Sequence, residues 1–73
     1  MKKFHAHCSV TDEGDYTVHI FLRRLRTPKL EFIGDVREHP LHNATRKARE
    51  YIADVYGVEY IDQKISFTYS WVS

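Results

Sequence analysis

Cysteine, glycine and proline are scarce in this sequence, and each shortage excludes a class of protein. Cys8 is the only cysteine, so no disulfide can form within the chain. Three glycines and two prolines leave no glycine-rich phosphate loop and no flexible linker. No apolar run is long enough to cross a membrane, and the first ten residues lack the apolar core of a signal peptide. We therefore expect a cytoplasmic protein with no membrane partner, in which Cys8 is a small core residue.

The length of the chain limits how much apolar surface it can bury. Its 73 residues are enough for a single domain, residues 1–73, with a small core. A core of this size usually contributes no more than about 3–5 kcal/mol of net stability. Binding to a partner, or to a second copy, would therefore increase the stability of this chain.

Residues 40–57 form the only long segment with helical periodicity. Their apolar side chains recur at three- and four-residue steps and predict one buried stripe: Leu41, Ala44, Ala48, Tyr51, Ile52 and Val55. Pro40 suits the first helical turn, where its missing N–H would have no partner. Gly57 suits the left-handed position that ends a helix.

Four other segments alternate apolar and polar residues, which predicts strands near residues 4–10, 16–23, 30–36 and 61–71. In the third, Leu30, Phe32 and Val36 are expected to face the helix. Ile33 is expected on the outer face with Phe21, and Gly34 to mark a bulge or a bend.

The order strand, strand, strand, helix, strand predicts an α+β fold with two layers. Short turns make the first three strands an antiparallel meander, and a right-handed crossover brings the last strand beside the first. The expected sheet order is 4-1-2-3, with the helix on one face. If Val10 pairs with Tyr16, the acidic turn 11–15 and the basic connection 23–29 lie at opposite ends of the sheet.

Charged and aromatic side chains are the candidates for binding a partner. The basic connection comes first, then the exposed side of the helix, then aromatic residues: Phe21 on the outer face, and Tyr69 and Trp71, which together with Tyr16 one narrow helix cannot fully cover. These residues are Arg23, Arg24, Arg26 and Lys29; Arg46, Lys47 and Arg49; and Phe21, Tyr69 and Trp71. Arg46 and Glu50 are also spaced for an ion pair along the helix.

Three histidines, His5, His7 and His19, are expected on the outer face of the sheet. Such a cluster could hold a transition metal, or could respond to mild acid. However, a two-residue spacing on a strand is not specific for metal, and surface histidines are commonly solvated. We therefore expect no metal and no cofactor.

No pattern in the sequence supports catalysis. His7 and Cys8 are adjacent on a strand and point to opposite faces, so they cannot act as a dyad. We expect a non-enzymatic binding protein, an inhibitor or adaptor that occupies the surface of a partner protein. The first alternative is a nucleic-acid-binding domain that uses residues 23–29, although a net charge of +1 is small for that role. A self-associating homodimer is another.

Two resemblances bear on function. The segment Gly14–Val18 (GDYTV), the pair Gly34 and Asp35, and a helix with Ala44 and Ala48 resemble the N-terminal domain of HicB-like antitoxins. That family has a partial ribonuclease-H-like order of three strands, a helix and a strand, so the resemblance implies this fold and an antitoxin function. In size and plan the chain is also similar to small phage-encoded proteins that inhibit host transcription, nucleases or CRISPR defence.

Overall fold

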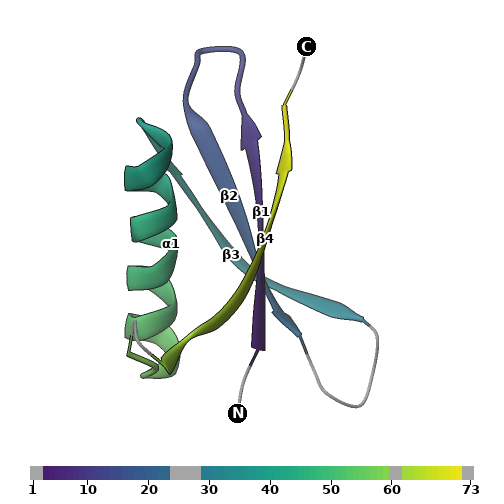
Figure 1. Cartoon of the computed structure of the whole chain (residues 1–73), viewed down its shortest axis with the longest axis vertical. Coiled ribbons are helices and arrows are strands. Elements are labelled where there is room, and N and C mark those ends of the chain that lie inside the picture. Colours follow the sequence, from purple (N-terminus) through teal and green to yellow (C-terminus); the bar gives the residue numbers. More distant parts are fainter. Residues whose placement is uncertain (1–2, 24–28, 60–61, 72–73) are drawn as a thin grey trace.

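Four strands and one helix follow one another as the sequence predicts, in the residues 3–23, 29–59 and 62–71 that the computed structural model describes (Figure 1). The strands are β1 (Lys3–Val10), β2 (Tyr16–Arg23), β3 (Leu30–Glu38) and β4 (Lys64–Ser70). The helix α1 (Leu41–Tyr56) connects β3 to β4. In the described part of the chain, no helix is both long and apolar enough to cross a membrane.

The strands form one mixed sheet in the order β3-β2-β1-β4, which confirms the predicted order read from its other edge. β1 pairs with β2 and β2 with β3 in antiparallel fashion, and β4 runs parallel to β1. The predicted register is also confirmed, because Val10 pairs with Tyr16 and His7 with His19. The β1–β2 turn and the ends of β2 and β3 at Arg23 and Leu30 therefore lie at opposite ends of the sheet, as Figure 1 shows.

The core lies between α1 and the face of the sheet that α1 covers. Alternate residues of β1 and β2 face the helix, and small side chains on α1 let it lie close to them. The buried apolar residues are Phe4, Ala6, Cys8, Val18, Ile20, Leu22, Ala44, Ala48 and Ile52. Cys8 is fully buried, which agrees with its predicted role as a core residue.

The predicted end of the helix at Gly57 is confirmed, and the helix begins one residue later than predicted, at Leu41. Pro40 has an extended backbone and immediately precedes the first helical residue, and its carbonyl accepts from the N–H groups of Asn43 and Ala44. Gly57 adopts the left-handed conformation at φ 68°, and its N–H donates to the carbonyl of Ala53.

One member of the predicted helical stripe is wrong. Val55 is 55% exposed, and Tyr56 packs on the core instead, with its ring 5.5 Å from that of Phe4 in an edge-on contact. Positions three and four residues after Ile52 both fit helical periodicity. The larger ring at position 56 occupies the place beside Phe4.

The prediction of which residues in the first half of β3 face the helix is also wrong, because a bulge changes the alternation of inward and outward side chains. Ile20 pairs with Gly34 and Phe21 pairs with Phe32, so Ile33 is an extra residue on β3. Ile33 packs against the core, whereas Leu30 and Phe32 lie on the outer face and are 43% and 55% exposed. The bulge predicted near Gly34 is therefore present, and it reverses the predicted places of Phe32 and Ile33.

Gly34 brings the bulge close to α1. A Cβ atom at this position would lie 2.5 Å from the hydroxyl oxygen of Tyr51, too close for any real contact. The same hydroxyl donates a hydrogen bond to the carbonyl of Ile33. The tyrosine therefore holds the bulged backbone to the helix, and only glycine leaves it room.

The last strand is shorter than predicted. It spans Lys64–Ser70, Asp62 lies in a short turn before it and Trp71 follows it directly. Ile61, which the prediction included, lies outside the described residues.

Candidate binding surfaces of the sheet

The helix covers β2 and β3 more fully than β4 (Figure 1). Aromatic residues at the end of β4 therefore stay exposed. Tyr69 is 51% and Trp71 50% exposed, and their ring centroids are 5.4 Å apart. Tyr16 is half-buried, lies edge-on to Trp71 at 5.6 Å and stacks on His39 at 6.2 Å. The prediction that one helix would leave these aromatic residues partly uncovered is confirmed.

These rings lie next to an open strand edge. β4 is the last strand of the sheet and pairs only with β1 among the described residues. It has no proline or bulge, and Lys64, at its start, is its only charged residue. We call the free edge of β4 together with Phe67, Tyr69 and Trp71 the β4 surface.

The basic residues of α1 are engaged with neighbours. Arg46 pairs with Glu50 at 3.9 Å, as its spacing predicts, and Arg49 lies over the ring of Phe67 at 5.4 Å. The ammonium group of Lys47 is 2.7 Å from a carboxylate oxygen of Glu38, and this hydrogen bond lowers the pKa of Glu38 and raises the pKa of Lys47. These side chains are therefore poorer partner-binding candidates than the sequence suggests.

The basic end of the sheet is partly described. Arg23 and Lys29 are exposed there, as predicted, whereas Arg24 and Arg26 lie outside the described residues. The register adds Lys3 and Lys64, because Lys3 pairs with Arg23 on one side and with Lys64 on the other. Lys64 is a residue that the sequence reasoning missed. Only the parallel register of β4 brings it into this row.

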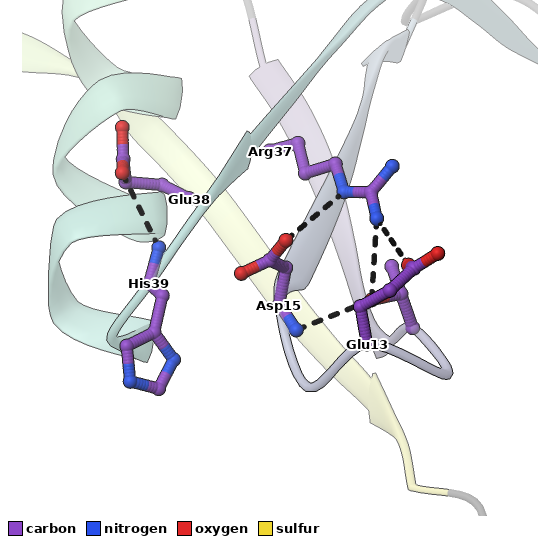
Figure 2. Close-up of polar contacts among 6 residues, drawn as sticks. Glu13, Asp15, Arg37, Glu38 and His39 are labelled. Carbon is purple, nitrogen blue, oxygen red and sulfur yellow. Dashed lines mark hydrogen bonds and ion pairs between the residues drawn. The ribbon is translucent and has the colours of Figure 1, made fainter.

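The opposite end of the sheet carries the acidic turn, where Arg37 of β3 reduces the negative charge. Figure 2 shows its guanidinium group reaching between Glu13 and Asp15, and its Nε lies 3.5 Å from the carboxylate of Asp15. The side chain of Thr11 also accepts from the N–H of Asp15. The predicted acidic pole is therefore partly neutralised, although exposed pairs of this kind add little stability.

The three predicted histidines lie on the outer face, but the imidazoles of His5 and His7 contact the hydroxyl group of Thr68. His5 Nε2 and His7 Nδ1 lie 3.0 and 2.7 Å from the hydroxyl oxygen of Thr68. Since that hydroxyl has one proton, at least one of the two imidazoles must donate to it. The described residues contain no group of three His, Cys, Asp or Glu side chains that could hold a metal ion.

Burial is the main cause of a lowered pKa at His5, and the charges of His7 and Arg23 lower it further. The imidazole is therefore held in its neutral form more strongly than a free histidine. Protonation in mild acid, the other predicted role of this cluster, works against the folded environment of His5.

Phe32 is the second functional candidate that the sequence reasoning missed. It meets Phe21 edge-on at 5.6 Å, and His5 and His19 lie beside the pair at 6.3 Å from Phe21 and 6.1 Å from Phe32 respectively. Phe21, which was predicted on this face, is half-buried there. The ring of Phe32 joins that of Phe21 on the outer face only because of the bulge in β3.

Comparison with family models, with curated proteins and with solved structures finds no match for this chain. The resemblance to HicB-like antitoxin domains and to phage-encoded inhibitors therefore stays a prediction. Proposals about function depend on the geometry of these surfaces.

Proposed function

We propose that this is a non-enzymatic binding protein that occupies the surface of a partner protein through its β4 surface. The observation that carries the proposal is a pair of half-exposed aromatic side chains, Tyr69 and Trp71, next to an unpaired strand edge. Tyrosine and tryptophan are the residues that most often dominate binding energy at protein interfaces.

The form of the β4 surface favours a partner that supplies an extended segment. A free strand edge offers alternating N–H and C=O groups to such a segment, while neighbouring side chains select its sequence. On the helix side of β4, Phe67 and Tyr69 would contact the added side chains, and Arg49 lies above Phe67. The strand has no device that would discourage such an addition except Lys64 at its beginning.

Cross-linking to proteins of the native cell or host would test this proposal. The tagged chain should capture a defined partner, and Tyr69→Ser or Trp71→Ser should reduce its capture at least tenfold. Val55→Ser is the matched control, because Val55 is similarly exposed but lies on α1 and is not part of the β4 surface. Equal capture by all four proteins would contradict the proposal.

The purified partner allows a direct measurement. Trp71 is the only tryptophan in the sequence, so its emission should shift to shorter wavelength when an added segment excludes water from it. Sedimentation of the chain alone, over a range of concentrations, shows whether a second copy occupies the same edge. A dimer that resists Tyr69→Ser and Trp71→Ser would place self-association elsewhere.

A further inference from the structure

The outer face of the sheet, away from α1, carries a row of three cations. Lys64, Lys3 and Arg23 occupy neighbouring strands in register, and all three are exposed. Within the described residues, no carboxylate lies within ion-pair distance of any of them. Like charges placed directly opposite each other on a sheet are destabilising, so a bound anion would relieve their repulsion. We call these residues the cation row.

The cation row borders a hollow large enough for an anionic group. The hollow has a volume of about 260 Å³, and its lining combines the three cations with Phe4, Ile65 and Ser66. The Ser66 hydroxyl adds a hydrogen-bond donor to the positive charges. A phosphate group fits this combination of size, charge and donors.

A row of rings lies one step along the strands from the cation row. Two residues along a strand from Lys3 and Arg23 come His5 and Phe21, a distance of about 6.6 Å. Phe32 extends the row onto β3, and it is 55% exposed. This spacing is of the order that separates the phosphate and the base of one nucleotide, so both rows can contact the same nucleotide.

We propose that the outer face binds a short segment of single-stranded nucleic acid, with phosphates on the cation row and bases stacked on Phe32 and Phe21. Single-stranded nucleic acids are bound by this combination of positive charge along the backbone and aromatic side chains under the bases. An acidic peptide would use the cations but would leave the two phenyl rings without a role. The small net charge of +1 makes the attraction local, which suits a few nucleotides.

This site uses Lys64 and Ser66 of β4 but none of the aromatic residues of the β4 surface. Its cations, Ser66, Phe21 and Phe32 lie on the face of the sheet away from α1, and the hollow reaches Phe4 and Ile65 at the end of the strands, whereas Tyr69 lies on the helix side, on the face of buried Cys8. Either proposal can therefore fail without the other.

The direct test is fluorescence anisotropy of a labelled ten-nucleotide single strand, measured with the full chain at several salt concentrations. Three phosphate contacts predict a slope of about −2 for log K against log [salt], or roughly 20-fold weaker binding between about 50 and 200 mM salt. The double variant Arg23→Gln, Lys64→Gln should reduce the slope to about −0.7. Arg46→Gln removes an exposed cation from α1 and should leave the slope unchanged.

A separate substitution tests the stacking of bases on Phe21 and Phe32. Phe32→Ser should weaken binding about fivefold or more at every salt concentration without changing the salt slope, because stacking involves no phosphate contact. Val55→Ser is the matched control for the loss of an exposed apolar side chain. Circular dichroism and thermal unfolding of each variant verify that it is folded.

Three results would overturn the proposal. The first is the absence of binding at about 20 mM salt. The second is equal loss of affinity in the Arg46→Gln control, which would indicate general charge attraction. The third is competition by tripolyphosphate or poly-glutamate together with no effect of Phe32→Ser, which would reduce the site to one for anions alone.

Discussion

The two edge strands of the sheet, β3 and β4, differ in how well their free edges are protected from pairing with another strand. β3 has a bulge, four charged side chains and a helix packed beside it. β4 is regular, has one charge at its start and exposes two aromatic residues at its end. Bulges, charges and covering elements protect an edge from adding another strand. A single helix can therefore protect only one edge of a four-stranded sheet, which leaves the other edge available for binding.

The largest effect is expected from a substitution at Gly34, in the protected edge strand β3. Gly34→Ala would put a methyl group 2.5 Å from the Tyr51 hydroxyl oxygen and 2.7 Å from its ring carbon Cζ. Overpacking of this kind costs about 1–3 kcal/mol, which exceeds the ~0.4–1 kcal/mol that alanine gains by restricting the unfolded chain. Urea denaturation should therefore show a clearly lower free energy of unfolding.

Ser66→Ala on β4 serves as the control for Gly34→Ala, because Ser66 is exposed and its substitution should change stability by less than about 0.5 kcal/mol. If both variants unfold at the same urea concentration, Tyr51 has room to move and the close contact does not anchor β3.

A smaller effect is expected where β4 is joined to the helix. Gln63 is buried just before β4, and its Nε2 donates to the carbonyls of Arg49 and Val58 at 2.9 and 3.0 Å. Gln63→Ala removes both bonds and should cost about 1–2 kcal/mol. The open side of the sheet has few other ties to the helix, so hydrogen exchange should accelerate more in β4 than in β3.

Asn43→Ala is the comparison for Gln63→Ala. Asn43 makes a longer, exposed hydrogen bond of 3.4 Å to the carbonyl of His39, and its loss should cost less than about 0.5 kcal/mol. Uniform acceleration of exchange across the sheet in Gln63→Ala would show that Gln63 stabilises the whole fold and not β4 in particular.

The smallest expected effect is a dependence of stability on pH at His5. Because the folded pKa lies below the ordinary value of about 6.5, the unfolded chain takes up the proton first and stability falls as pH decreases through that value. The loss stops below the folded pKa. The charged and titratable groups on the same face of the sheet are Lys3, His7, His19, Arg23, Asp35, Arg37 and Lys64.

Thermal unfolding between pH 7.5 and 5 would measure this effect. His5→Gln should flatten the decrease of the midpoint, while His42→Gln, on the exposed side of α1, should leave it unchanged. A wild-type midpoint that rises as pH falls from 7 to 6 would reverse the sign and contradict the lowered pKa.

The fold could be predicted from the sequence because the sequence patterns that specify it are local and agree with one another. Alternation in β1 and β2, helical periodicity in residues 41–56 and the left-handed Gly57 each follow from neighbouring residues. The exposure of Tyr69 and Trp71 also followed from the widths of a helix and a sheet. These quantities do not depend on distant contacts.

The residues that share the outer face were harder to predict from the sequence, because long-range strand pairing brings them together. Phe32 reaches that face only because Tyr51 and Gly34 hold a bulge in β3, and Lys64 joins the cation row only through its register with Lys3. The contacts of the helix cations could not be predicted for a similar reason, since Glu38 and Phe67, which contact Lys47 and Arg49, come from other elements.

The bulge in β3 has a consequence for changes in chain length. Ile33 is the unpaired residue, so deleting it would preserve the odd-even parity of the strand on both sides and keep Phe32 facing outward. Deleting any other single residue between 30 and 38 and retaining Ile33 would invert that parity over part of β3 unless the bulge closed. Ile33 is therefore the position in β3 at which a deletion preserves the facing of both halves of the strand, although it also removes a side chain that packs on the core and the carbonyl that accepts from Tyr51.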